Sequence, residues 1–481
     1  MNREFLLNIF FLITINLLIK PFFIFGIDRT VQNTVGAQEY GIYFVLLNFT
    51  YLFQIINDFG IQNFNNRKIS QYSQLLDKYF PNILILKSLL ATAYLGVIFA
   101  FGYWAGYSQQ YFQLLLFIAF NQVLVSFIFY LRSNISGLAM YRIDSLISAF
   151  DKLLMIIFCS VLLWTPLLSG EFRIEYFVFA QSLSLALTAL IAFIIVRKRI
   201  KRLQFVFNKP FLISILRESA PYALVIFLMT VYTRIDGVMI ERLLDNGKYE
   251  AGVYASAYRL LDASNMIGFL FAGLLLPMFA RMIKQGDSIL ALLRQSFQMI
   301  WTGAITLAIA TYCFRTEIML LLYTEADPYW GEVLGMLMFS FIAVSGTYIY
   351  GTLLTANGSM RKMNIIFIIS VGLNVVLNYF FILQYQALGA ATVTLLTQFF
   401  ALFAQMWLAS REFRLPFNFR LLLRILFFAG LLSALAYGLK QSPLDWRLSF
   451  VGLGATGLLL AMLLKMIDLS ALIGWISARK Q

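Results

Sequence analysis

The chain has 481 residues, of which 61% are hydrophobic and only 12% are charged, and its formal net charge is +14 at pH 7. An ordinary soluble domain has roughly a quarter of its residues charged, so a water-soluble fold could not cover this much apolar surface. The sequence contains no histidine, which excludes an imidazole base, a histidine metal ligand and a Ser-His-Asp triad.

Apolar blocks of about twenty residues, separated by short polar stretches, run through the chain. A helix needs about 20 apolar residues to cross the hydrocarbon core of a bilayer. We therefore expect an all-α polytopic membrane protein with about fourteen transmembrane helices. The first block lacks a small-residue cleavage pattern, so we expect it to be retained as a span. The predicted spans are 4–26, 39–62, 81–103, 111–131, 145–165, 174–196, 217–241, 251–278, 296–322, 331–355, 363–383, 387–409, 421–439 and 448–468.

Two predicted spans begin with the same short pattern. The second begins with Glu39-Tyr40-Gly41-Ile42-Tyr43 and the eighth with Glu250-Ala251-Gly252-Val253-Tyr254, so both contain E-x-G-x-Y after a short outer loop. These places are equivalent in two sets of six spans, which predicts two pseudo-symmetric six-helix lobes and two further C-terminal helices. The expected divisions are an N-lobe at 1–205, a C-lobe at 206–412, and an accessory pair with a cytoplasmic tail at 413–481.

Lysine and arginine residues concentrate in alternate loops, on the side that also holds both termini, with the densest run at 197–202. By the positive-inside rule this side is cytoplasmic. We therefore expect a multi-pass membrane protein with its N- and C-termini in the cytoplasm. The basic run could contact anionic lipid head groups, which we favour over binding to nucleic acid.

Several kinds of chemistry are not expected. Cys159 and Cys313 fall inside predicted spans and are typical of small apolar core residues rather than a disulfide or a metal pair. The sequence has no G-x-x-x-x-G-K-[ST] loop for a nucleotide phosphate and no long loop that could hold a catalytic domain. We expect no metal site and no enzyme activity.

The seventh predicted span carries the most informative charges, Arg234 and Asp236, near Thr230 and Thr233. Charges at membrane depth are costly and need a partner or an aqueous cavity. Arg234 and Asp236 are two positions apart and point in different directions on a helix, so a local ion pair is not expected. Arg234 then faces either a cavity, which we favour, or a partner on another helix.

Other predicted spans carry stripes of polar residues along one helical face, in addition to the polar residues of the seventh span. A single such residue more often makes a helix-to-helix hydrogen bond, and Arg259 could simply pair with Asp262 at i, i+3. Their occurrence in both halves nevertheless favours a hydrated internal surface, suited to a sugar carried on a phosphate. The stripes are Asn8, Asn16 and Lys20; Tyr51, Gln54 and Asp58; Asp144, Ser148 and Asp151; Ser370, Asn374 and Asn378; and Thr394, Gln398 and Gln405. The candidate substrate-binding residues are Arg234, Asp236, Lys20, Asn16, Asp58, Arg259, Asn374 and Asn378.

Loose, glycine-rich pieces in order along nearly the whole chain resemble the polysaccharide and O-antigen flippases of the multidrug/oligosaccharidyl-lipid/polysaccharide exporter superfamily. The pieces are PYALVIFLMTVYTRID at 221–236; Ala251-Gly252-Val253-Tyr254 with Ala257 and Pro277; Asn357-Gly358 through Asn374 and Asn378 to Gly389-Ala390-Ala391-Thr392; and Tyr40-Gly41 with Asp58-Phe59-Gly60.

The resemblance implies two six-helix lobes in a V with two extra helices. It also implies translocation of undecaprenyl-pyrophosphate-linked oligosaccharide repeat units across the bacterial cytoplasmic membrane by alternating access, for surface polysaccharide biosynthesis. The implied partners are this lipid-linked oligosaccharide, membrane lipids, and a polysaccharide polymerase with its chain-length machinery. No cofactor is implied beyond a coupling ion, H+ or Na+. Two alternatives stay open, a cation-coupled multidrug antiporter of the same superfamily and a membrane-embedded polysaccharide polymerase or transferase.

Overall fold

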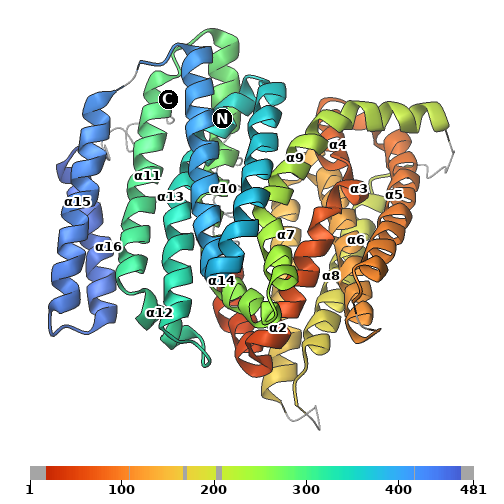
Figure 1. Ribbon diagram of the computed structural model, residues 1–481. Coiled ribbons are helices and arrows are strands. Elements are labelled where there is room, and N and C mark those ends of the chain that lie inside the picture. The colour runs from red at the N-terminus through yellow and green to blue at the C-terminus, as the bar shows by residue number, and fades with distance from the viewer. Residues whose placement is uncertain (1–17, 108, 166–170, 202–207, 417, 467–481) are drawn as a thin grey trace. The chain divides into compact units, whose positions relative to one another are not determined.

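The computed structural model describes residues 18–107, 109–165, 171–201, 208–416 and 418–466, and this part of the chain forms helices and connecting turns without any β-strand (Figure 1). The all-α prediction is confirmed. Contacts divide the chain into two compact units, Met1–Glu241 and Arg242–Gln481. These units are defined by contacts, whereas the predicted lobes were defined by the repeated E-x-G-x-Y segments. The lobes at 1–205, 206–412 and 413–481 therefore stay a prediction.

The first unit is built from one π-helix, one short 3-10 helix and eight α-helices in the described residues. Its core joins α5 to α6, where the rings of Phe80 and Tyr130 stack with centroids 5.7 Å apart and the Tyr130 hydroxyl donates to the Phe80 carbonyl at 3.0 Å. The elements are η1 (Phe23–Asp28), α2 (Arg29–Leu52), α3 (Gln54–Asp58), α4 (Ile61–Gln71), η2 (Ser73–Leu75), α5 (Leu76–Trp104), α6 (Gln109–Gly137), α7 (Tyr141–Trp164), α8 (Ile174–Arg197) and α9 (Lys209–Leu243).

The second unit is organised around α13, which packs against α10, α11 and α14. Close packing of α13 relies on small residues. A side chain at Gly331 would meet the backbone of Thr316 at 3.0 Å. The pair α15 and α16 packs on α11, as Figure 1 shows. The elements are α10 (Gly247–Gln285), α11 (Leu290–Cys313), α12 (Arg315–Leu322), α13 (Pro328–Ala356), α14 (Met360–Phe413), α15 (Phe419–Gln441) and α16 (Trp446–Leu463).

The lengths and composition of these helices are those of a multi-pass membrane protein. Ten helices of the described residues are long and apolar enough to cross a bilayer, or eleven if α11 and α12, bent by 76°, are one span. The helix α14 has 54 residues but is interrupted at Gln386, where φ is 54° and ψ is −133°. At 1.5 Å per residue its length is about 80 Å, over twice a hydrocarbon core, so it covers two of the predicted spans. The count of fourteen stays a prediction, because the first predicted span falls mostly outside the described residues.

The first expected loop differs from the structure. Residues 27–38 were expected to link two spans, but the chain stays helical until Gly36, where φ is 83°. Only glycine adopts this conformation without a steric penalty, so the direction of the chain changes at Gly36. The predicted second span, 39–62, is also interrupted, because α2 ends at Leu52 and α4 starts at Ile61.

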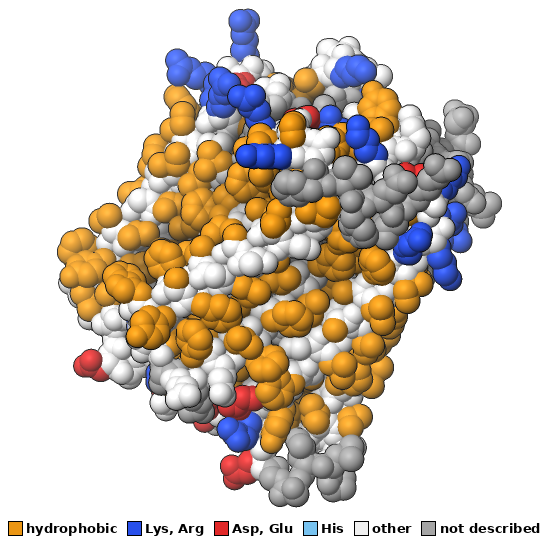
Figure 2. All heavy atoms as spheres, turned by 90° about the vertical axis from the view of Figure 1, so that its right-hand side faces the viewer, with side chains coloured by type: hydrophobic (Ala, Val, Ile, Leu, Met, Phe, Trp, Pro, Cys, Tyr) orange, Lys and Arg blue, Asp and Glu red, His pale blue; other side chains and the backbone are white. Residues whose placement is uncertain are grey.

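Surface side chains are sorted by polarity as a bilayer requires. On the face shown in Figure 2, lysine and arginine side chains gather at one end, beyond a broad apolar band, while a few charged side chains lie at the other end. This arrangement agrees with the unequal loop charges on which the expected topology depends.

Candidate functional site

The candidate site lies where the helix predicted as the second span is broken. After Leu52 comes the five-residue helix α3, and both Phe59 (φ 48°) and Gly60 (φ 72°) adopt the left-handed conformation before α4 begins. A left-handed phenylalanine is strained and needs support from its surroundings. The break ends one helix and starts another, which leaves polar backbone groups of α3 available to side chains from neighbouring helices.

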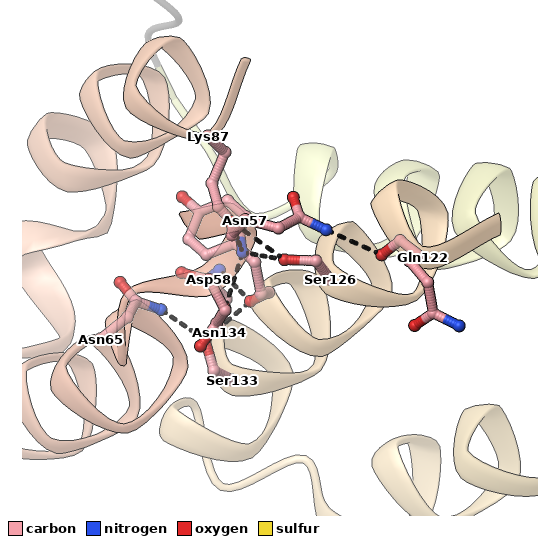
Figure 3. A network of polar contacts seen from close by, with 9 residues as sticks. Asn57, Asp58, Asn65, Lys87, Gln122, Ser126, Ser133 and Asn134 are labelled. Carbon is pink, nitrogen blue, oxygen red and sulfur yellow. Dashed lines mark hydrogen bonds and ion pairs between the residues drawn. The ribbon is translucent and has the colours of Figure 1, made fainter. Parts of the chain in front are cut away.

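The side chain of Lys87, from α5, occupies the end of α3. Its Nζ lies 2.7 Å from Asp58 Oδ1, donates to the Asn57 carbonyl at 3.4 Å and also donates to Ser126 of α6 (Figure 3). Lys87 is only 4% exposed, and a buried charge requires a partner of opposite sign. Asp58 was predicted to face a cavity. In the structure its carboxylate forms an ion pair with Lys87 that stabilises the break.

Further hydrogen bonds tie both sides of the break to α6 (Figure 3). Asn57 Nδ2 donates to the Gln122 carbonyl at 3.0 Å, and Asn65 Nδ2 of α4 donates to Ser133 Oγ at 2.8 Å. Hydrogen bonds between buried groups are stronger in a low-dielectric interior than in water, so these contacts hold the geometry of the break. Polar contacts therefore hold the chain on both sides of the break, through Asn57 and Asp58 before it and Asn65 after it.

A small pocket opens beside the break, between α2 and α3 on one side and α9 on the other. Tyr51, Gln54 and Asp58 line it together, which agrees with the helical face that their spacing predicts. Its volume of about 30 Å³ holds a water molecule but no sugar. The remaining lining residues are Ile55, Phe59, Gly60, Ala223, Ile226, Phe227 and Thr230.

Arg234 lies next to this pocket. Its guanidinium carbon is 5.3 Å from the centroid of the Tyr51 ring, a cation–π distance. Asp236 is 1% exposed, whereas Arg234 is half-buried. Their different environments match the different directions predicted from the spacing, and the structure brings Arg234, Tyr51 and Asp58 to one wall of the first unit.

A second group of charges lies on α6 and α7 of the first unit. Arg132 and Asp144 form a two-pronged pair at 2.7 and 3.3 Å, and Lys152 Nζ lies 3.3 Å from Asp151 Oδ2. Lys20 is half-buried and interacts electrostatically with Asp151, Arg132 and Lys152. Asn16, the neighbour predicted to share its helical face, lies outside the described residues.

In the second unit the predicted asparagines pair with each other. Asn378 Nδ2 donates to Asn374 Oδ1 at 3.0 Å, and both side chains are fully buried on α14. Thr394 also contributes to this polar interior, with its Oγ1 3.1 Å from the Tyr254 hydroxyl. Arg259 is half-buried on α10. Substrate binding by any of these residues stays a prediction.

Glu250 and Tyr329 were not predicted, although Glu250 stands in the repeated E-x-G-x-Y segment. Glu250 Oε2 accepts hydrogen bonds from the Tyr329 hydroxyl at 2.8 Å and from the Ala387 backbone N–H at 3.2 Å. The Leu388 N–H in turn donates to the Tyr329 oxygen at 3.3 Å. The carboxylate therefore caps the helix that starts after the break at Gln386.

Lys87 was also missed, although a lone lysine inside the apolar run ILILKSLLATAYLG is an available signal, because intramembrane charges are rare. As for metal ions, the described residues contain no group of three or more His, Cys, Asp or Glu side chains able to hold one.

The model of a family described as "Polysaccharide biosynthesis protein" matches residues 5–283. A search of curated proteins by sequence finds no match.

Three solved structures show where this fold recurs. The lipid II flippase MurJ, in an inward closed conformation, superimposes with a TM-score of 0.67 at 15% identity over 91% of this chain and 98% of its own. An inward-facing multidrug resistance MATE family transporter of the MOP superfamily gives 0.65 at 16% identity over 80% of this chain and 93% of its own. A MOP superfamily transporter from Pyrococcus furiosus gives 0.59 at 15% identity over 85% of this chain and 94% of its own. At these identities the likeness shows the fold alone.

Proposed function

The chain belongs to the polysaccharide biosynthesis protein family, and from this premise we propose that it is a flippase for lipid-linked oligosaccharide. In the proposed cycle it moves undecaprenyl-pyrophosphate-linked repeat units from the cytoplasmic to the outer leaflet of the bacterial cytoplasmic membrane, with its own termini on the cytoplasmic side. The solved structures of the same fold are transporters and a flippase, which supports transport over an enzymatic role.

The main support for this proposal is that the side chains of Tyr51 and Arg234 lie together on one wall of the first unit. Ionisable residues in membrane-spanning helices mark substrate pathways by default. A guanidinium binds phosphate oxygens in a planar, two-pronged manner, and an aromatic ring offers a flat apolar face to a sugar. The two groups lie in contact at 5.3 Å, so one wall presents both chemistries that a sugar pyrophosphate needs.

Substrate binding requires this wall to open. The pocket beside it has about 30 Å³, whereas small-molecule sites typically have 300 Å³ or more. We propose that α9 separates from α3 when the substrate enters, while the ion pair of Lys87 and Asp58 keeps the broken helix in shape. An H+ or Na+ gradient supplies the energy, and a polysaccharide polymerase with its chain-length machinery receives the product.

The pairing of acidic groups argues against the alternative, a cation-coupled multidrug antiporter. Cationic drugs need carboxylates that are not already neutralised. In the first unit Asp58, Asp144 and Asp151 each lie within 3.3 Å of a lysine or arginine nitrogen. These acids are poor drug ligands, so we favour the anionic substrate. A polymerase or transferase is disfavoured too, because the described part of the chain contains no long loop that could hold a catalytic centre.

Depletion in the cell of origin tests the proposed function. We expect cells without the protein to accumulate lipid-linked repeat units that face the cytoplasm and to lose the corresponding surface polysaccharide. Drug susceptibility is measured in parallel. Normal polysaccharide export together with increased drug sensitivity would instead support the antiporter.

A further inference from the structure

A groove runs between the two helical segments of α14, in the second unit and apart from the pocket described above. It has a volume of about 600 Å³, within the range of small-molecule sites. Six of its lining residues are Lys362, Ile365 and Ile369 from the first segment, and Ala404, Trp407 and Arg411 from the second.

The groove has one charged end, and the rest of its lining is apolar. Lys362 and Arg411 lie near the start and finish of α14, at Met360 and Phe413, where a membrane-spanning helix emerges from the bilayer. Away from this charged end the groove is apolar and open to its surroundings, with Ile365 59% exposed and Trp407 62% exposed. A tryptophan at this level is typical of the membrane interface.

The charged end carries an excess of positive charge. Glu412 accepts hydrogen bonds from Lys362 Nζ at 2.7 Å, Ser359 Oγ at 2.5 Å and Asn357 Nδ2 at 3.0 Å, so its oxygens are already occupied. The Arg411 guanidinium lies 5.3 Å from the Trp407 ring. Within the described chain it makes no ion pair, because the nearby carboxylate of Glu412 is engaged with Lys362. One cation therefore remains for an anionic ligand.

We infer that this groove binds an anionic phospholipid from the leaflet on the cation-rich side of the membrane. The phosphate lies between Lys362 and Arg411, and one acyl chain follows Ile365, Ile369 and Trp407. An anionic head group complements the net charge of the groove, whereas a zwitterionic lipid would bring a second cation close to Arg411. Lysines and arginines at the membrane surface attract anionic lipid, and the adjoining apolar groove gives the chain a place that a free phosphate would not use.

Fluorescence quenching of Trp407 tests this inference. The full-length protein is reconstituted into vesicles that contain brominated phosphatidylglycerol or brominated phosphatidylcholine at equal mole fraction. The Trp407 signal is the part of the emission that Trp407→Phe removes. We expect phosphatidylglycerol to quench this part at least about twofold more strongly than phosphatidylcholine, because each basic residue favours anionic lipid. Equal quenching by the two lipids would overturn the inference.

Variants locate the binding site. The double variant Lys362→Gln/Arg411→Gln should lose the preference for phosphatidylglycerol. The matched control Arg414→Gln/Arg420→Gln removes two exposed cations nearby that do not line the groove, and it should keep the preference. A preference that survives in the first variant, or disappears equally in both, would contradict the inference.

A competition experiment needs no variant. Unbrominated phosphatidylglycerol added to the wild-type protein in vesicles with brominated lipid should restore Trp407 fluorescence, while inorganic phosphate should not. Restoration by inorganic phosphate, or a stronger effect of an isoprenoid phosphate than of phosphatidylglycerol, would assign the groove to another ligand and contradict the inference.

Discussion

The two units each contain a broken helix, and they stabilise the break with charges of opposite sign. In the first unit the cation of Lys87 lies at the C-terminal end of α3, against the Asn57 carbonyl. In the second unit the carboxylate of Glu250 accepts from the Ala387 N–H, where a helix begins. Helix C-termini attract cations and helix N-termini attract anions. In each unit, therefore, the buried charge at the break has the sign that stabilises the helix end beside it.

The two breaks differ in how their charges are balanced. Lys87 is neutralised by Asp58 at 2.7 Å, so the first break contains a full ion pair. Among the described residues, the donors to Glu250 are all neutral: the Tyr329 hydroxyl, the Ala387 N–H and Asn246 Nδ2. Removing one member of an ion pair leaves a buried charge, which costs more than the loss of a neutral donor. The comparison therefore predicts unequal responses to substitution.

The largest expected effect is that of Lys87→Met. It leaves Asp58 without its cation, and the loss should lower the free energy of unfolding by about 3 kcal/mol, at the low end for a buried pair because Asp58 is partly exposed. Thermal unfolding of the purified protein measures this loss.

The double variant Lys87→Met/Asp58→Asn serves as its control and should recover most of the stability, because no charge is left unpaired. Equal melting temperatures for Lys87→Met and the wild-type protein would show that the pair does not support the break.

A smaller effect is expected from Glu250→Gln. The amide keeps one acceptor oxygen but loses the charge, so the free energy of unfolding should fall by about 1–2 kcal/mol. Glu39→Gln changes the matching position of the other E-x-G-x-Y segment, where Glu39 borders a surface pocket, and should change stability little. Similar losses for both variants would show that the two glutamates have equivalent roles.

The smallest effect is expected from Tyr329→Phe, which removes the hydroxyl that links Glu250 to the Leu388 N–H. One net hydrogen bond corresponds to about 1 kcal/mol. Tyr437→Phe is a suitable control because this tyrosine is exposed on α15. A loss as large as that of Lys87→Met would mean that the second break is the more fragile one.

The helices were predictable because apolar length is a local property of the sequence, and the stripe of Tyr51, Gln54 and Asp58 was predictable from helical spacing. Interactions between distant residues were not. Asp58 is 29 positions from Lys87, and Glu250 is 137 positions from Ala387. The break at Gln386 falls in the gap between the predicted spans 363–383 and 387–409, but the positive φ of this glutamine was not predictable, because such a conformation is strained and needs support from its tertiary surroundings.

Transport by purified protein tests the central claim most directly. The protein is reconstituted into vesicles with a fluorescent undecaprenyl-pyrophosphate-linked oligosaccharide, and the fraction of label that reaches the opposite leaflet is measured under an H+ or Na+ gradient. We expect the wild-type protein and the exposed-cation control Arg281→Ala to move the label, and Arg234→Ala to slow it at least about tenfold, the effect of losing a charged hydrogen bond to phosphate. No movement by the wild-type protein, or full activity of Arg234→Ala, would contradict this account.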